Sequence, residues 1–157
     1  MSTPLPFDKI TIEQSITKRF STVAASFADH KAVVSATETL TYRALERQAN
    51  GVAYALNEHL GTGNDPVLVV LPHETVMIVS ILGALKANKA YVALDPSTPP
   101  AQVRAVQAQI QARLVITNAD LALAGLFDAE MTAIVTPEDC LATVSYTHLT
   151  LPTICSV

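Results

Sequence analysis

The residues with the most direct chemical potential are a histidine and a carboxylate placed side by side. His73 and Glu74 follow the apolar run VLVVL at 67–71. A run without polar alternation is typical of a parallel strand covered on both faces. Open α/β sheets bind ligands beyond the carboxyl ends of their strands, so this pair could contact a ligand. The alternative is that Glu74 opens a helix, where its charge suits the positive end of the helix dipole.

Other reactive side chains have the same two interpretations. Lys86 and Lys89 could attract an anion, whereas a solvated helix end explains them without any ligand. Asp95 could act as an acid catalyst, whereas its place directly before a proline suits a turn. Tyr42 and Tyr91 are expected to be core rings with the hydroxyl at the edge. These patterns assign no catalytic, cofactor-binding or metal-binding residue.

Several well-defined site motifs are missing from the sequence. Gly61 and Gly63 would need a third glycine at 66 for a dinucleotide fingerprint, but Pro66 stands there. No lysine follows a glycine, and there is no G-x-S-x-G elbow, which excludes a P-loop and a nucleophile elbow. Cys140 and Cys155 form neither a metal motif nor a disulfide framework. The histidines are scattered without metal spacing, at His30, His59, His73 and His148.

Composition narrows the class of protein. The 157 residues are 50% hydrophobic and 15% charged, and the net charge is −4. We expect one domain with a hydrophobic core. We do not expect a nucleic-acid partner, because the composition provides no basic surface. The N-terminus lacks a signal-peptide pattern, and no run reaches the roughly 18 apolar residues of a membrane span. The expectation is a cytoplasmic protein without a membrane span.

Helical and strand patterns alternate along the chain. Parallel crossover units follow from this alternation, so we expect an α/β fold, an open and mostly parallel sheet with helices on both faces. The expected helices cover 12–27, 42–60, 75–87, 103–110 and 121–126. The expected strands cover 32–34, 39–41, 67–71, 90–94, 113–117 and 131–135, with the segment at 90–94 read as a buried strand.

Local signals set the boundaries of these elements. The stretch 11–14 has the form of a capping box, and Thr41 suits the N-cap of the next helix. Gly61 is expected to end that helix. Asn88 is expected to stop the helix at 75–87 through a left-handed conformation. Gly83 is a small residue where another element could approach. The first helix should bury one face, formed by Ile12, Ile16, Phe20, Val23 and Phe27.

The end of the chain departs from this pattern. From Cys140 to Val157 there is no charged Asp, Glu, Lys or Arg, and neither a helical period nor a partner strand is evident. One interpretation is an edge strand with a tail. The other is a non-native tail, because the stretch resembles the translated adapter sequence found at the ends of reading frames from short-read sequencing.

Two ordered motifs resemble a known enzyme family. LTYRALERQANGVAYAL at 40–56 resembles the first core motif of AMP-forming adenylation enzymes, and LKANKAYVALD at 85–95 resembles the second. Their spacing, with RFSTVAASFADHKAVV before them, is similar to adenylation domains of nonribosomal peptide synthetases. The resemblance covers about 10–137. The matching positions are Leu40, Thr41, Tyr42, Leu45, Leu85, Lys86, Ala87, Ala90, Tyr91 and Asp95.

Three departures from the family pattern have physical consequences. Ala44 replaces the family's glutamate at the third helical position, which forfeits a capping-box bond and costs about 0.5 to 1 kcal/mol. Asn88 replaces its glycine and keeps the left-handed turn at a modest cost. Ala93 replaces its usual proline. Both motifs therefore read as scaffold.

The resemblance implies an enzyme that uses ATP and magnesium to convert a carboxylic acid, most simply an amino acid, into an acyl-adenylate. It further implies transfer of the acyl group to the phosphopantetheine thiol of a carrier protein. The family's phosphate loop, ribose-binding acid and late lysine would lie beyond this chain, so we expect the fragment alone to be inactive and to bind no cofactor well. The implied division is 1–10 disordered, 11–143 adenylation-domain portion and 144–157 tail. The alternatives are an acyl-CoA synthetase and a non-enzymatic α/β binding module.

Overall fold

The computed structural model describes residues 9–118, 120, 127 and 133–135. The expected helix at 121–126 and the tail at 144–157 lie outside the described residues. The elements in chain order are α1 (Lys9–Ile12), α2 (Ile16–Ser26), β1 (Lys31–Val34), β2 (Thr39–Thr41), α3 (Tyr42–Leu60), β3 (Val67–Val70), α4 (Thr75–Lys86), β4 (Tyr91–Leu94), α5 (Pro100–Ile110), β5 (Leu114–Ile116) and β6 (Ala133–Val135).

The described strands β3 to β6 form one parallel sheet in the order β4-β3-β5-β6. In this sheet Val67 of β3 pairs with Tyr91 of β4 on one side and with Leu114 of β5 on the other. All four residues of β3 are fully buried, as the uninterrupted apolar run predicts for a central parallel strand. The expected open α/β sheet is confirmed.

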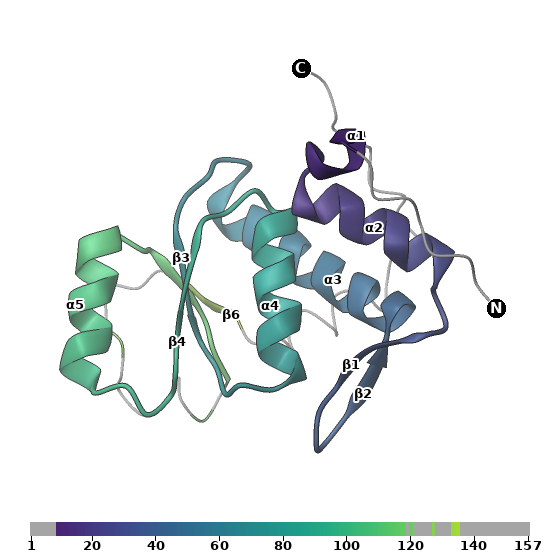
Figure 1. Ribbon diagram of the computed structural model, residues 1–157. Coiled ribbons are helices and arrows are strands. Elements are labelled where there is room, and N and C mark those ends of the chain that lie inside the picture. Colours follow the sequence, from purple (N-terminus) through teal and green to yellow (C-terminus); the bar gives the residue numbers. More distant parts are fainter. Residues whose placement is uncertain (1–8, 119, 121–126, 128–132, 136–157) are drawn as a thin grey trace.

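Helices cover both faces of the sheet, with α3 and α4 on one side and α5 on the other (Figure 1). The strand pleat explains this division, because successive side chains of β3 point to opposite faces. Val67 and Val69 belong to the core under α3 and α4, whereas Leu68 and Val70 belong to the core under α5. The sheet is therefore buried from both sides along β3.

The helices α3 and α4 pack closely against each other at Gly83. A Cβ placed on Gly83 of α4 would lie 2.5 Å from the Cβ of Val52 in α3. A larger side chain at this crossing would force the two helices apart, which confirms the prediction that another element approaches there. Asn88 ends the α4 segment with φ at 59°, and Gly61 ends α3 with φ at 70°. Both predicted helix stops are confirmed.

The start of the chain differs from its prediction. Instead of one helix over 12–27, the helix α2 begins after Ser15, whose hydroxyl accepts a hydrogen bond from the Lys18 amide at 3.2 Å. The capping box predicted at 11–14 is wrong, since α1 spans part of that stretch. Ile12 and Ile16 are exposed, so the predicted buried face holds only from Phe20 onward. Serine caps a helix as well as threonine does, and the sequence contains both. The helix α1 also begins inside the stretch 1–10, for which the sequence predicts disorder.

The strand β4 also differs from its prediction. The sequence predicts a buried strand, but among the described residues β4 is the edge strand of the sheet. Its exposure alternates, with Tyr91 and Ala93 exposed and Val92 and Leu94 partly buried against the α5 side. Tyr91 is therefore no core ring, in contrast to its prediction. An apolar run alone does not distinguish a central strand from an edge strand whose second face is open.

Candidate functional site

The carboxyl edge of the sheet gathers the polar residues singled out by the sequence. His73 and Glu74 follow β3, and Asp95 follows β4. Because β3 and β4 are parallel neighbours, these ends lie at the same edge. Asp95 Oδ1 accepts hydrogen bonds from the Ser97 amide at 2.8 Å and from the Ser97 hydroxyl. The prediction that Asp95 forms a turn is confirmed.

The same contacts set the charge state of Asp95. The hydrogen bond from the Ser97 hydroxyl, and next that from the Ser97 amide, lowers the pKa of Asp95 below its ordinary value. Desolvation opposes these two hydrogen bonds, and the electrostatic interaction with His73 makes the smallest contribution, again lowering the pKa of Asp95. Asp95 is thus ionised at neutral pH and accepts protons or hydrogen bonds there. It is unsuited to donate a proton as an acid catalyst at that pH.

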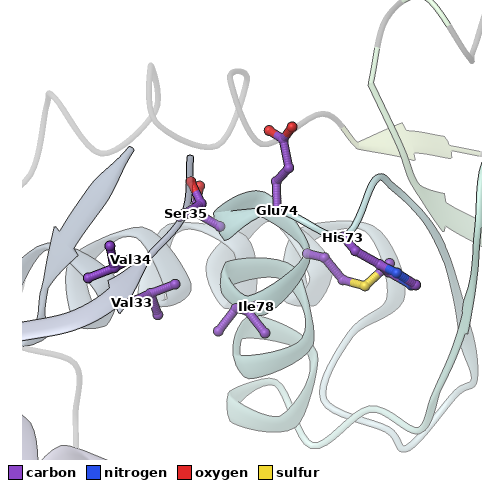
Figure 2. A pocket seen from close by; sticks show the side chains of 8 residues that line it. Val33, Val34, Ser35, His73, Glu74 and Ile78 are labelled. Carbon is purple, nitrogen blue, oxygen red and sulfur yellow. The ribbon is translucent and has the colours of Figure 1, made fainter. Parts of the chain in front are cut away.

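A hollow of about 260 Å³ lies beside this edge, between the start of α4 and the hairpin formed by the antiparallel strands β1 and β2 (Figure 2). Figure 2 shows Val33, Val34 and Ile78 on facing elements of the hollow, with His73 at its other end. Val34 and Ile78 remain largely exposed. The exposed lining surface is mostly apolar, although four of the eight lining residues carry hydrogen-bonding side chains, namely Ser35, His73, Glu74 and Thr75.

The start of α4 is tied to the hairpin by a carboxylate from elsewhere in the chain. Glu74 occupies the N-cap of α4, but its side chain makes no capping hydrogen bond. Instead the Thr75 hydroxyl donates to Glu38 Oε2 at 2.7 Å. The negative charge at this helix start therefore comes from Glu38 as well as from Glu74. The structure places Glu74 at a helix start, as one of its two interpretations expected.

The first motif is used for capping and packing. The Thr41 hydroxyl accepts a hydrogen bond from the Ala44 amide at 3.2 Å, which confirms the predicted N-cap of α3. Leu40 and Leu45 are buried in the main core. The ring of Tyr42 lies 6.1 Å from that of Phe20, centroid to centroid. These four motif positions anchor α3 on the hairpin and on α2.

The second motif forms the connection from α4 to β4. Ala87 is buried and caps α4, and the carbonyl of Leu85 accepts a hydrogen bond from the Asn88 amide at 3.1 Å. The carbonyl of Ala90 accepts from the Val67 amide at 2.8 Å and so starts the β3–β4 ladder. The motif thus carries the chain from a helix into the sheet within a few residues.

Lys86 is neither a solvated helix end nor an anion site, so both of its predicted interpretations are wrong. Its side chain is 11% exposed, and its Nζ donates to Glu46 Oε1 at 2.8 Å and to the Ser21 hydroxyl at 3.2 Å. Ser21 also donates to the same carboxylate oxygen at 2.8 Å. The three residues come from α4, α3 and α2, so this cluster joins three helices.

Lys89 also differs from both of its predicted interpretations. Its side chain is fully buried at the amino edge of the sheet, opposite to the edge that carries His73. The Nζ donates to the carbonyls of Gly61, at 2.6 Å, and of Gly63. Its partners are mainly backbone oxygens. No local sequence pattern predicts these partners, because every residue has a backbone carbonyl.

Among the described residues there is neither a cluster of metal-ligating side chains nor a helix that could span a membrane. Within the described part of the chain, no three His, Cys, Asp or Glu side chains gather in a way that could hold a metal ion. Over the same residues, no helix combines the length and the apolar character that crossing a bilayer requires.

Comparison with known proteins gives one family and a consistent set of relatives. The family model described as "AMP-binding enzyme" matches residues 20–150. A plipastatin synthase subunit from Bacillus subtilis (strain 168) is 34% identical over 128 residues, which are 80% of this chain and 4% of that protein. Surfactin synthase subunit 2 from the same organism is 36% identical over 107 residues, or 68% of this chain and 3% of that protein.

Solved structures agree with the sequence relatives. The nonribosomal peptide synthetase FmoA3, in its alpha-methyl-L-serine-AMP bound form, superposes with a TM-score of 0.75 at 27% identity, over 81% of this chain and 14% of that one. NpsA-ThdA from Klebsiella oxytoca, an artificially fused adenylation-PCP di-domain, superposes with a TM-score of 0.71 over 83% of this chain and 24% of that one. At 16% identity the second likeness shows the fold alone. The chain thus spans a small part of each of these proteins.

Proposed function

The chain belongs to the AMP-binding enzyme family as the N-terminal part of an adenylation domain of the nonribosomal peptide synthetase type, and from this we propose the activity of its parent protein. The parent joins a carboxylic acid, in our proposal an amino acid, to the AMP part of ATP. The carboxylate oxygen attacks the α-phosphorus, the bond to the β-phosphate breaks, and pyrophosphate leaves. A carrier-protein thiol then attacks the acyl carbon, so that a thioester forms and AMP leaves.

The similar proteins support each part of this proposal. FmoA3 has been solved with an aminoacyl-AMP and with AMPPNP, an ATP analogue, which supports ATP as a substrate of the parent. The adenylation-PCP fusion supports a carrier protein as the acceptor. The similarity to the plipastatin and surfactin synthases favours the peptide-synthetase branch over an acyl-CoA synthetase.

Within that parent, we assign this chain the role of scaffold. The single observation that carries this assignment is the use of the motif positions: Thr41 caps α3, Lys86 pairs with Glu46, and Ala90 starts the sheet ladder. Adenylation needs groups that position two substrates and neutralise developing charge. The side chains of Thr41 and Lys86 are engaged in the fold instead.

Magnesium is proposed for the parent protein, and no residue in the part of the chain that the structure describes is assigned to hold it. That part gathers no three carboxylate, histidine or cysteine side chains. No step of the reaction is therefore assigned to magnesium on these residues.

The division into an adenylation-domain portion at 11–143 and a non-native tail at 144–157 also remains a proposal, and the family match ends at residue 150.

Pyrophosphate exchange into ATP, measured with a mixture of the twenty amino acids, tests this assignment. We expect the purified 157-residue chain to give exchange equal to a no-enzyme control, and a complete peptide-synthetase adenylation domain assayed in parallel to give exchange. Amino-acid-dependent exchange by the 157-residue chain would overturn the scaffold role. A fold check by circular dichroism of the same sample ensures that inactivity is not caused by unfolding.

A further inference from the structure

The loop between α3 and β3 surrounds one buried positive charge with oxygen atoms. Lys89 is 3% exposed as a residue, and its side chain is fully buried. Its Nζ donates to the carbonyl oxygen of Gly61 at 2.6 Å and to that of Gly63. The carboxylate oxygen Oδ2 of Asp65 lies 3.9 Å away. Three loop oxygens thus converge on a group that has three N–H donors.

These distances show which oxygens hold the Lys89 ammonium most closely. The carbonyls are within hydrogen-bond distance of the ammonium, whereas the carboxylate is at the limit of an ion pair. Arg113 shares that carboxylate, since its Nη2 lies 3.1 Å from Asp65 Oδ1. The charge of Asp65 is therefore divided between two cations. Lys89 is held mainly by the backbone of the loop, unlike a lysine in an ordinary buried ion pair.

The shape of the loop depends on its two glycines. Gly61 has φ at 70°, a left-handed conformation that glycine adopts without strain. A Cβ on Gly63 would lie 2.9 Å from Asp65 Oδ2, so a side chain there would push the carboxylate aside. Backbone carbonyls and carboxylates are the ligands that proteins use for hard cations. The loop therefore has the chemistry of a cation site.

We propose that residues 61–65 form a cation-binding loop whose resident cation is the ammonium group of Lys89. By holding this ammonium, the loop fixes the end of α3 to the residues that precede β4. Arg113, directly before β5, joins the same carboxylate. The loop thereby sets the relative positions of three neighbouring strands at the amino edge of the sheet.

A loop that binds through carbonyl dipoles should accept a free cation of similar size and charge once the tethered one is removed. Lys89→Ala leaves the oxygens in place and opens a channel to them. Lys89→Met removes the charge but keeps the channel filled. The pair of variants therefore separates loss of a cation from loss of packing.

The test is the melting temperature of the 157-residue chain and of both variants in chloride salts at equal ionic strength. We expect both variants to melt at least about 5 °C below the parent chain, because the loop oxygens lose their donor. Ammonium or potassium at about 0.5 M should raise the melting temperature of Lys89→Ala by about 2 to 4 °C relative to the value in the bulky N-methylglucamine cation. Lys89→Met should not respond. Equal responses of the two variants, or a Lys89→Met variant as stable as the parent, would overturn the proposal.

Two measurements decide the question if the Lys89 variants do not fold. In the unaltered chain, we expect the ammonium protons of Lys89 to give a slowly exchanging NMR signal at neutral pH, distinct from those of solvated lysines. Its absence would contradict a sealed, fully hydrogen-bonded ammonium. Asp65→Asn should shift the melting temperature by only about 1 to 3 °C, because the carbonyl partners remain. Global unfolding of Asp65→Asn would show an ordinary buried ion pair and reject the carbonyl-based site.

Discussion

The crossing of α3 and α4 gives the sharpest prediction about stability. Replacement of Gly83 by alanine places a Cβ 2.5 Å from the Cβ and 2.6 Å from the Cγ1 of Val52, and 3.0 Å from the carbonyl oxygen of Ala49. Carbon atoms in contact are normally about 3.5 to 4.0 Å apart, so the shortfall is about 1 Å. The Cβ of Val52 is fixed to its backbone and cannot rotate away. The two helices must therefore separate.

The magnitude follows from two opposing effects. Overpacking of this kind costs about 1 to 3 kcal/mol, and more where no side chain can turn aside. Alanine gains about 1 kcal/mol over glycine inside a helix. Because both Val52 and Ala49 are almost fully buried, the separation disturbs well-packed core. The upper part of the overpacking range, about 2 to 3 kcal/mol, therefore applies, and after subtraction of the helix-propensity gain we expect Gly83→Ala to lower the free energy of unfolding by about 1 to 2 kcal/mol. With an m-value of about 2 kcal/mol/M, the urea midpoint falls by about 0.5 to 1 M.

A double-mutant cycle supplies the control. Val52→Gly removes the Cβ that the new methyl group would meet, and by itself it should destabilise through a cavity. In the Val52→Gly background, Gly83→Ala should lower the free energy of unfolding much less than it does alone, which gives a coupling energy of about 1 kcal/mol or more. The measurement is urea unfolding followed by circular dichroism, with unchanged m-values. If Gly83→Ala stabilises the chain, or if the two changes add without coupling, the close approach of the helices is refuted.

Three further substitutions test other contacts. Lys86→Met should lower the free energy of unfolding by about 1 to 3 kcal/mol, because Glu46 loses its charged partner. The other carboxylate oxygen, Glu46 Oε2, is already buried without a hydrogen-bond partner among the described residues. The double variant Lys86→Met with Glu46→Gln should lose less stability in urea unfolding, and an equal loss would refute the pairing. Thr41→Ala should cost about 1 kcal/mol through the lost N-cap of α3, and Thr41→Ser should restore the stability; unchanged stability in Thr41→Ala would reject the cap. The pKa of Asp95 is lower in the folded chain than its unfolded value of 3.8, so the contribution of Asp95 to stability is present above pH 3.8. This contribution is lost as the pH falls through the folded pKa. Asp95→Asn should therefore be less stable than the parent at pH 7 and equally stable in strong acid, and a stability difference that persists unchanged in strong acid would contradict this sign.

The sequence predicted the parallel sheet and most element boundaries because the responsible signals are local. Thr41, Gly61 and Asn88 act through their own backbone conformation or through a bond to the next turn, and the structure confirms all three. The central strand β3 follows from four apolar residues in a row. The motif resemblance added the family, which the comparisons confirm.

The failures of prediction share a physical cause, which is that they depend on distant partners. Lys86 and Lys89 lie near one helix end, where solvent is the usual surrounding, but Glu46 from α3 and two loop carbonyls enclose them. Tyr91 is exposed because β4 is the edge strand of the described sheet and the face that carries Tyr91 is open. No spacing along the chain encodes such contacts. The start of α2 is a different case, because Ser15 and Thr11 are both suitable caps and local propensity does not choose between them.

The central claim, that this chain is the N-terminal part of an adenylating ligase, is tested most directly by sequencing the genomic DNA downstream of the codon for Val144. The account predicts that the frame continues within a few dozen codons into a Ser/Thr/Gly-rich phosphate loop that ends near a lysine. A frame that instead runs through the present residues 144–157 to a stop codon after Val157 would contradict the account. In that case the short chain would be complete, and a non-enzymatic α/β binding module would be the function to pursue.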